Sequence, residues 1–461
     1  MAFLIGGANT ESAAYEIDNS LRFNDGDEPD LDITSADGNE DIWSWSAWVK
    51  RSALKASGEQ FLFCGSGDGS NNTEIKFQND QFTYINYDAS SNNSYIRTTA
   101  KYRDVSAWYH LVVIIDMSQG TDTDRIKLYV NGVRNTTLDQ TTYAGQNVDT
   151  YMNVNSGTHR IGADARTAAN WFGGYMAEMH FVDGTAKEAS DFGEFDGDSG
   201  IWKPKEYTGS YGTNGFYMEF KQTGTSANAS GIGADTSGNG KHYTPANLAA
   251  TDICTDTPTN NFATLNPLMA SLPTNAVYQG MFEGNTGSWT SSADNSADYR
   301  QWSSIAIPHT EKWYIETKWS RNQGDHGKGR LGILAFQDDV THGVVLDGEF
   351  DKIVNNSASS YGSGQMAYGE IFGALYDLAN DEVTFYEAGS SLGTISWTPN
   401  SSYTYYHVVF ADGQSLEYKV NFGNPAFSIS SGNNDPAGYG NFEYGTNSGY
   451  ALCTKNLAEY G

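Results

Sequence analysis

The sequence has few cysteines, few positive charges and no long hydrophobic run, and each shortage excludes a class of protein. Its three cysteines, Cys64, Cys254 and Cys453, lie too far apart in sequence for a Cys-x-x-Cys metal site. An odd number of cysteines also cannot form a complete disulfide framework. We therefore expect reduced, buried thiols in a protein that is made in a cytoplasm.

No hydrophobic stretch approaches the roughly 18 apolar residues of a membrane-spanning helix. The first residues, MAFLIGGA, have no basic n-region and are too short for a secretory signal. We expect a chain that has no transmembrane segment and is not secreted. Residues 1–14 are interpreted either as a short docking peptide for a partner or as a frayed terminus.

Positive charge is scarce, because 27 Lys and Arg residues face 56 Asp and Glu residues and leave a net charge of −29. A nucleic-acid-binding protein needs a cationic surface that displaces counterions, and anionic membranes repel an acidic chain. The charge balance therefore argues against nucleic acid as a binding partner and against membrane insertion. It fits a soluble surface and leaves a place for a divalent cation between carboxylates.

Proline is scarce as well, with 10 residues, whereas glycine reaches 50 and aromatic residues make up 13% of the chain. Many aromatic residues together with Gly, Thr, Asn and Ser are typical of all-β proteins. This many Tyr, Phe and Trp side chains would not stay solvated, so the composition also argues against disorder.

The spacing of apolar residues predicts β-strands along most of the chain. In IWSWSAWVKR, residues 42–51, apolar and polar side chains alternate and place Trp43, Trp45 and Val49 on one face. AWYHLVVIID, residues 107–116, is apolar on both faces, as a central strand requires. Turn signals recur every eight to fifteen residues and no helical period is sustained, which predicts antiparallel sandwiches.

Two similar hairpins lie far apart in the chain. RIKLYVNGVRN, residues 125–135, has an aliphatic face and an Asn131-Gly132 pair that supplies the positive φ angles of a tight turn. VTFYEAGSSLG, residues 383–393, repeats the pattern. No tandem repeat joins them, so we expect each half of the chain to close its own two-sheet core. The expected units are an N-terminal segment (1–14), a first jelly roll (15–230), a turn-rich connector (231–280) and a second β-sandwich (281–461).

Both halves resemble known families. SLRFNDGDEPDLDI, WSWSAWVKR, AWYHLVVIID, IKLYVNGV, RIGAD and GGYMAEMHFVDG occur in the order seen in the laminin-G-like branch of the concanavalin A-like jelly rolls. The second half is similar to SPRY domains through WYIETKW, LGILA, GEIFGALYDLANDEVTFYEAGSSLGTISW and YHVVFADG. The resemblance implies two antiparallel concanavalin A-like β-sandwiches in series.

The segments between the two halves resemble connectors of tailed-bacteriophage structural proteins, particularly tail fibres and related surface proteins of marine phages. The matching segments are SDFGEFDGDSGIWKPKEYTGSYGTNGFYMEF, GADTSGNG and DTPTNNFATLNPL. This resemblance implies a virion protein that is assembled in the host cytoplasm and contacts other virion proteins. It also implies binding to a host-surface glycan or receptor, by a homo-oligomer such as a trimer.

Relatives of this jelly roll include β-glucanases, whose catalytic carboxylates follow the pattern E-x-D-x-x-E on one strand. Glu349 and Asp351 come nearest to it, but Val354 stands where the third carboxylate belongs. Three further carboxylates in predicted strands are isolated in sequence: Glu178, Glu219 and Glu316. We therefore expect no catalytic residues and a protein that is not an enzyme.

The histidines and serines indicate no catalytic site either. The eight histidines form neither a metal cluster nor an H-E-x-x-H motif, and the sequence holds no G-x-S-x-G elbow. His110 and His407 each follow an aromatic residue in a predicted core strand. We interpret both as hydrogen-bonded structural histidines.

Sugar sites combine aromatic faces with short Asp and Asn side chains, and two loops of the first half have these ingredients. The residues concerned are Asp68, Asn71, Asn72, Asp164, Asn170 and Trp171. Laminin-G relatives often hold Ca²⁺ at the corresponding rim, which implies Asp68 and Asp164 as its ligands. Asp, Asn and Gly also form turns that need no ligand.

In the second half, the resemblance to SPRY domains implies a binding rim formed by loops. It would place Asp338, Asp339 and His342 near that rim.

Three functions remain open at this point. The first is a non-enzymatic adhesion protein, which gains from several weak sites acting together. The second is a capsid decoration or tail-accessory protein, which would expose a large apolar patch to other virion proteins. The third is a polysaccharide depolymerase, which needs paired carboxylates in a groove.

Overall fold

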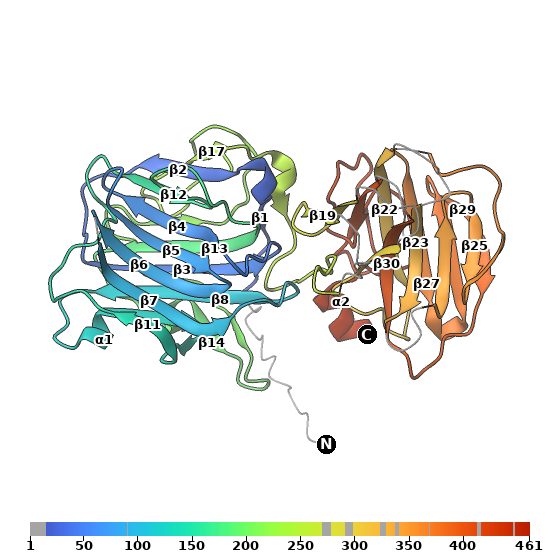
Figure 1. Ribbon diagram of the computed structural model, residues 1–461, viewed down its shortest axis with the longest axis horizontal. Coiled ribbons are helices and arrows are strands. Elements are labelled where there is room, and N and C mark those ends of the chain that lie inside the picture. The colour runs from blue at the N-terminus through green and yellow to red at the C-terminus, as the bar shows by residue number, and fades with distance from the viewer. Residues whose placement is uncertain are drawn as a thin grey trace, which may run out of the picture.

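The computed structural model describes residues 15–89, 91–269, 278–290, 298–322, 329–336, 341–367, 369–412, 416–445 and 448–461. The all-β prediction is confirmed: two antiparallel β-sandwiches lie side by side along the long axis of the molecule (Figure 1). Within the described residues, the helices are short and consist of α1 (Asp122–Arg125), α2 (Thr454–Tyr460) and the 3-10 turns η1 (Asp25–Asp27), η2 (Ala189–Asp191), η3 (Ala250–Asp252) and η5 (Leu378–Asn380).

The first sandwich consists of two sheets. Sheet A runs, in spatial order, through β10 (Val133–Arg134), β9 (Ile126–Val130), β8 (Trp108–Asp116), β3 (Ile42–Arg51), β13 (Gly174–Asp183), β1 (Ser20–Phe23) and β18 (Ile253–Cys254), with β16 (Phe216–Met218) also paired to β13. Sheet B runs through β11 (Leu138–Thr142), β7 (Ser91–Lys101), β6 (Gln81–Asp88), β5 (Asn72–Gln78), β4 (Glu59–Ser66), β12 (Thr158–Ile161), β2 (Asp30–Thr34) and β17 (Thr244–Ala246). A separate hairpin pairs β14 (Gly193–Phe195) with β15 (Trp202–Pro204).

The second sandwich has the same two-layer plan. Sheet C runs through β19 (Tyr278–Phe282), β20 (Gly287–Thr290), β31 (Leu416–Asn421), β22 (Trp313–Asn322), β27 (Ile371–Asp377), β28 (Glu382–Glu387) and β29 (Ser390–Ser396). Sheet D runs through β21 (Asp298–Trp302), β30 (Tyr405–Asp412), β23 (Gly329–Ala335), β24 (Gly343–Asp347), β25 (Asp351–Val354) and β26 (Ser357–Ser360). The short pair β32 (Asn433–Asn434) and β33 (Asn441–Phe442) lies near the C-terminus of the chain.

Each sandwich encloses its own hydrophobic core, as the two hairpins predict. Trp43, Trp45 and Val49 of β3 are fully buried in the first core, where Ile126 and Leu128 of β9 pack with them. The residues of the second core lie mainly in sheets C and D, and none of them belongs to the first half of the chain. Alternation along the strands therefore identified the buried faces correctly.

The Asn131-Gly132 turn has the backbone that the sequence predicts. Asn131 and Gly132 have φ angles of +48° and +75°, and Val133 pairs with Val130 across the hairpin. Glycine is also required for space, since a Cβ atom on Gly132 would lie 2.2 Å from the ring of Trp202. In the second hairpin, Ala388 and Gly389 take the same left-handed angles, +45° and +78°.

The residues expected to form the connector add strands to the first sandwich. β17 pairs with β2, and β18 pairs with β1. Beyond β18, the buried carboxylate of Asp256 accepts a hydrogen bond from Lys50 Nζ of β3 at 2.7 Å. This segment is thus fixed to sheet A by backbone pairing and by a buried ion pair.

Further contacts join the two sandwiches. Tyr175 Oη of β13 donates to the carbonyl of Gly284 at 3.0 Å, and Asn285 Nδ2 donates to the carbonyl of Ser52 at 2.9 Å. The helix α2 lies between the sandwiches (Figure 1), and its Lys455 forms an ion pair with Glu16 at 2.7 Å. Backbone, side chains and the C-terminal helix all contribute to this junction.

The three cysteines are free and buried, as expected. Burial raises the pKa of the Cys254 and Cys453 thiols to about 11. Among the described residues, no helix is both long and apolar enough to cross a membrane.

Candidate functional site

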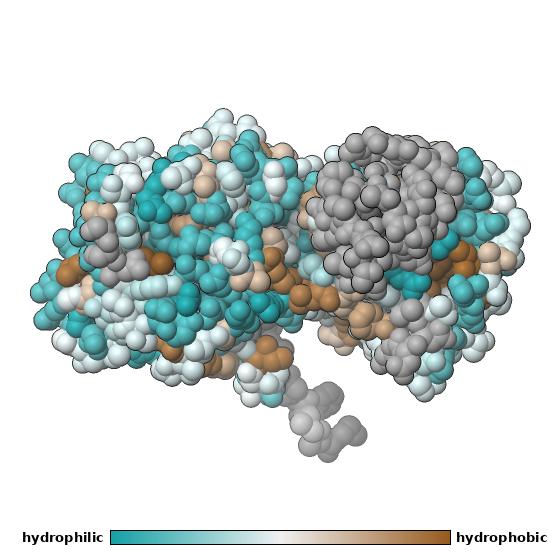
Figure 2. Space-filling model, viewed as in Figure 1, coloured by the Kyte–Doolittle hydropathy of each residue, from teal (hydrophilic) through white to brown (hydrophobic). Residues whose placement is uncertain are grey.

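The outer face of sheet B, the face turned away from the core, carries a band of polar side chains. Along β5, Ile75 and Phe77 enter the core, so the period of two directs Glu74, Lys76 and Gln78 to the outer face. In the view of Figure 2, the surface of the first sandwich is largely hydrophilic. The strand pattern therefore builds a polar platform directly over a hydrophobic core.

Charges of alternating sign cross this platform. Lys76 Nζ lies 2.7 Å from Glu59 Oε1 and also forms an ion pair with Glu74. Glu74 in turn faces Arg166 Nη2 at 3.4 Å, and Arg166 pairs with Asp164 at 3.0 Å. Burial alone would lower the pKa of Lys76, but the carboxylates of Glu74 and Glu59 outweigh it and raise that pKa.

Two hollows lie along this row of charged side chains, and Arg166 lines both of them. One, of about 250 Å³, is lined by Glu59, Glu74, Lys76, Gln78, Ile85, Tyr87, Tyr95 and Arg166. The other, of about 240 Å³, is lined by Ser66, Gly67, Asp68, Gly69, Ser156, Gly157, Thr158, Ala165 and Arg166. We call the two hollows together the sheet B groove.

Two tyrosines line the first hollow together with Arg166. Tyr87 of β6 and Tyr95 of β7 are half-buried and line the first hollow. Tyr95 Oη donates to Gln78 Oε1 at 2.6 Å and accepts from Arg97 Nη1 at 2.8 Å. The Tyr95 ring is thereby held in a fixed orientation beside polar groups.

The structure places Asp68 in the wall of the second hollow, as part of a tight turn. Its Oδ1 accepts hydrogen bonds from the backbone N–H groups of Ser70 and Asn71 at 2.7 and 2.9 Å. Its Oδ2 accepts from Asn71 Nδ2 at 3.0 Å. Asn72 is fully buried and donates to Glu74 Oε1 at 2.6 Å. Asn71 thus shapes the turn, and Asn72 orients a carboxylate of the groove.

The loop that begins at Asp164 folds over the outer face of sheet B. Asp164 is 3% exposed, and both of its carboxylate oxygens accept hydrogen bonds from Arg166. Ala165 packs against Phe61 and Cys64, and the carbonyl of Asn170 accepts from the N–H group of Phe61 at 3.1 Å. The loop is therefore docked on the sheet and presents Arg166 to the groove.

The other residues of this loop lie away from both hollows. Asn170 is exposed and has a φ angle of +55°, while Trp171 is half-buried and its Nε1 has no hydrogen-bond partner in the described part of the chain. Neither residue lines the groove. The structure thus brings Asp68 and the Asp164–Arg166 pair to one rim and leaves Asn170 and Trp171 outside it.

The predicted Ca²⁺ ligands both have protein partners. Asp68 is hydrogen-bonded within its own turn, and Asp164 is neutralised by Arg166. Over the described residues, no three His, Cys, Asp or Glu side chains are grouped so as to hold a metal ion. Calcium binding through Asp68 and Asp164 stays a prediction.

In the second sandwich, His342 lies in an aromatic cluster. Its Nδ1 is 2.8 Å from Tyr405 Oη, and its ring centroid is 5.3 Å from that of Tyr403 and 5.4 Å from that of Trp397. The predicted neighbours Asp338 and Asp339 lie outside the described residues.

Buried histidines and carboxylates elsewhere serve the fold. Burial lowers the pKa of His110 and of His407 to about 3, and each ring is hydrogen-bonded, to Ser46 and Tyr376 respectively. Glu316 of β22 is fully buried and accepts from the N–H groups of Glu443 and Tyr444. Burial raises the pKa of Glu316 to about 7.

The groove contains residues that the sequence did not single out: Glu59, Glu74, Lys76, Gln78, Tyr87, Tyr95 and Arg166. A signal for part of this set was present, because the alternation in EIKFQ separates Glu74, Lys76 and Gln78 from the core residues between them. Composition indicated the loop from Asp164 to Trp171, but nothing in its sequence pointed to Arg166 itself.

Residues 25–190 match a family model described as the concanavalin A-like lectin/glucanases superfamily. The expected laminin-G-like jelly roll is therefore confirmed over these residues. No curated protein matches the chain.

Solved structures also match parts of the chain. The SPRY domain of human HERC1 is 8% identical, with 34% of this chain and 96% of that domain covered and a TM-score of 0.28. The native heptameric SAP-like pentraxin of Limulus polyphemus is 18% identical, with 38% and 80% covered and a TM-score of 0.28. Domain 4 of AbnA, a GH43 extracellular arabinanase from Geobacillus stearothermophilus, in complex with arabinotriose, is 19% identical, with 34% and 67% covered and a TM-score of 0.25.

Proposed function

We propose that the chain is a non-enzymatic adhesion protein whose first sandwich binds a glycan in the sheet B groove. The observation that carries this proposal is the combination of two tyrosine rings, Tyr87 and Tyr95, with hydrogen-bonding groups in one open groove. Aromatic faces pack against the C–H side of a sugar ring, and fixed polar groups select its hydroxyls. The family model over residues 25–190, which covers lectins and glucanases, supports the same reading.

The polar groups of the groove include both donors and acceptors of hydrogen bonds. Arg166 donates from Nε and Nη2 to Asp164, and its Nη1 has no hydrogen-bond partner within the described residues. Carboxylate oxygens of Glu59 and the amide of Gln78 lie on the same platform. A sugar with adjacent hydroxyls would find donors on one side and acceptors on the other.

Binding without catalysis is supported by the position of Lys76. A glycosidase needs one carboxylic acid that holds a proton and a second carboxylate across the scissile bond. In the groove, Lys76 lies between Glu59 and Glu74 and forms an ion pair with each. Its raised pKa keeps this ammonium charged, so both carboxylates are held in ion pairs with a lysine that lies between them.

The setting we propose is the surface of a phage virion, with host attachment as the purpose. The support for it is the resemblance of the connector segments to tailed-phage structural proteins. A shallow, polar groove of this size binds weakly, so several copies, such as a homotrimer, would gain affinity by acting together.

An exposed apolar hairpin favours a second candidate, attachment to another virion protein. Phe195 and Ile201 are 54% and 67% exposed at the end of the β14–β15 hairpin, and Phe195 packs edge-on against Trp202. Val133, 60% exposed, follows the glycine that contacts Trp202. Exposed apolar groups gathered in this way are typical of protein contacts. Loss of the chain from assembled particles in a Phe195→Asp/Ile201→Asp variant that still folds would support docking through this hairpin, and normal incorporation would reject it.

A glycan array tests the leading proposal. The wild-type chain, Tyr95→Ala and Tyr129→Ala are compared, the last because Tyr129 is a half-buried tyrosine on the outer face of sheet A. We expect Tyr95→Ala to lose binding by about tenfold or more, because an aromatic contact and its hydrogen bonds are removed together. Tyr129→Ala should bind as the wild type does. Equal binding by all three proteins, or no glycan bound at all, would reject the proposal.

A further inference from the structure

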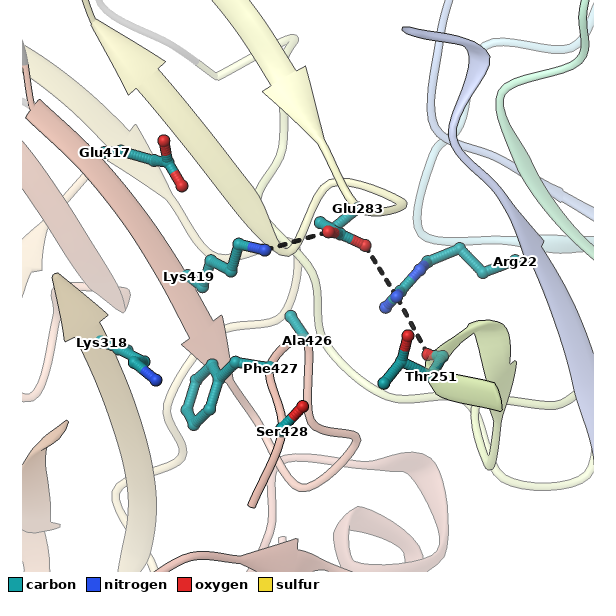
Figure 3. Close-up of a pocket in the computed structure, with 9 residues that line it drawn as sticks. All are labelled: Arg22, Thr251, Glu283, Lys318, Glu417, Lys419, Ala426, Phe427 and Ser428. Atoms are coloured by element: carbon teal, nitrogen blue, oxygen red, sulfur yellow. Dashed lines mark hydrogen bonds and ion pairs between the residues drawn. The ribbon is translucent and has the colours of Figure 1, made fainter. Parts of the chain in front are cut away.

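A second cavity lies between the two sandwiches, away from the sheet B groove. It has a volume of about 320 Å³, and Figure 3 shows the residues that line it. Arg22 and Thr251 come from the first sandwich, whereas the rest come from the second: Glu283, Lys318, Glu417, Lys419, Ala426, Phe427 and Ser428. A molecule bound here would therefore contact both sandwiches.

The cavity concentrates positive charge in a chain that has little of it. Arg22, Lys318 and Lys419 all line it, although the whole chain has only 27 Lys and Arg residues for 56 Asp and Glu residues. Lys318 of β22 and Lys419 of β31 are direct cross-strand partners. Like charges placed directly opposite one another destabilise a sheet unless an opposite charge lies between them.

The carboxylates of the cavity neutralise only part of this charge. Glu283 is shared, because its Oε1 lies 3.0 Å from Lys419 Nζ and its Oε2 lies 2.7 Å from Arg22 Nη2. Glu417 lies beyond Lys419, on the side away from Lys318 (Figure 3). Lys318 has no ion pair with any described residue, and its Nζ lies 5.5 Å from the ring centroid of Phe427.

The guanidinium of Arg22 is also incompletely partnered. Arg22 is 1% exposed, and its Nη2 donates to the carbonyl of Thr251 at 3.0 Å and to Asp252 at 3.2 Å. Its Nε and Nη1 have no hydrogen-bond partner among the described residues. A buried arginine held in this way gives the wall of the cavity a fixed positive charge.

We propose that this cavity binds a small organic anion, with its carboxylate or sulfate group beside Lys318 and Lys419. The anion supplies the counter-charge that Lys318 lacks, and Ser428 and Phe427 offer its remainder a hydroxyl and an aromatic side chain. A volume of about 320 Å³ is at the small end of ligand sites, which fits a molecule of the size of a sugar acid. Because it touches both sandwiches, the bound anion also stabilises their arrangement.

The proposal does not rest on glycan binding at the sheet B groove, and its test is separate. Calorimetric titrations use sodium D-galacturonate as the sugar acid, sodium sulfate as the bare anion and D-galactose as the neutral match. The proteins are the wild type, Lys318→Met and Lys352→Met. Lys352 is the matched control, because it is also a strand lysine whose Nζ lies near an aromatic ring, 5.7 Å from the centroid of Tyr361, but it does not line the cavity.

We expect galacturonate to bind the wild type and Lys352→Met with equal affinity, and sulfate to compete with it. Lys318→Met should bind galacturonate at least about tenfold more weakly, because a charge-assisted contact is lost. Equal thermal midpoints of the two variants would show that both are folded. If Lys318→Met binds galacturonate as tightly as the wild type does, the proposal is overturned, even if a glycan binds in the sheet B groove. Absence of binding by both galacturonate and sulfate would overturn it as well. Tyr95→Ala should leave the Lys318-dependent binding intact.

Discussion

The guanidinium of Arg22 in β1 and the carboxylate of Glu283, at the start of the turn between β19 and β20, form an ion pair 2.7 Å long that joins the two sandwiches. Glu283 extends the pair to Lys419 of β31 at 3.0 Å. Because Arg22 is almost fully buried, solvent screens this contact little. A single carboxylate thus connects sheet A to sheet C.

Replacing Glu283 by Gln should weaken the junction. The substitution removes the charge that pairs with both Arg22 and Lys419, and we expect a loss of about 2 kcal/mol in the free energy of unfolding, the usual range for a hydrogen bond to a charged group. Denaturant unfolding measures it. Asp124→Asn is the matched control. The Asp124 side chain is 44% exposed, so its ion pair with Arg134 should contribute less than about 1 kcal/mol to the free energy of unfolding. An equal, small effect of the two substitutions would contradict the role given to Glu283.

Asp256 should be more sensitive, since it anchors the segment between the sandwiches. Its carboxylate is fully buried and accepts from Lys50 Nζ, from Trp108 Nε1 at 3.2 Å and from the N–H group of Phe262 at 3.2 Å. Asp256→Ala leaves Lys50 buried without its counter-ion, so we expect a loss of about 3 kcal/mol or more. The double variant Asp256→Ala/Lys50→Met should recover part of that loss in the same unfolding experiment. No recovery would mean that the lone charge is not the cause.

Stability should depend on the protonation of Glu316. Burial raises its pKa to about 7 in the folded protein, whereas an unfolded Glu titrates near 4.3. Between these values the folded state holds a proton that the unfolded state has lost, so this group's contribution is complete below about pH 4 and is lost as the pH rises through about 7. The expected change is about 4 kcal/mol.

The Glu316→Gln variant isolates that contribution. Its free energy of unfolding, subtracted from that of the wild type at each pH, should leave a difference that changes between about pH 4 and pH 7 in the direction of a less stable wild type at higher pH. A difference that stays constant over this window would show that Glu316 does not titrate there.

Gly132 should not tolerate a side chain. Its φ angle is +75°, and an added Cβ would lie 2.2 Å from the Trp202 ring. Gly132→Ala should therefore cost about 2 kcal/mol in unfolding free energy. Gly120→Ala is the control, because a Cβ atom there meets nothing within 4 Å. Equal stability of the two variants would contradict the close packing of the β9–β10 hairpin on β15.

The fold was predictable where the signal is local. Alternation alone placed Trp43 and Trp45 in the core, and Asn131-Gly132 alone defined its turn. Contacts over long separations were not predictable in this way. Lys50 belongs to a strand that the sequence identified, but its partner Asp256 lies 206 residues further along the chain, in a segment without periodicity.

The candidate site was predicted in part for the same reason. The composition of two loops indicated Asp68 and Asp164 as candidate binding residues, and both lie at the rim of the groove. Asp and Asn side chains serve turns and ion pairs as readily as ligands, so composition could not show that Asp164 is bound to Arg166. The side chains that line the first hollow come from four neighbouring strands, β4 to β7, and from the loop that carries Arg166, and only the tertiary structure brings Tyr95 of β7 and Glu74 of β5 to the same hollow.

Hydrogen exchange of the wild-type chain with and without its array-selected glycan is the decisive test of glycan binding in the sheet B groove. We expect slower exchange of backbone amides in β5, β6 and β7 and in the loop around Arg166 when the glycan is bound. Protection confined to other parts of the molecule, with these strands unchanged, would contradict glycan binding in the sheet B groove.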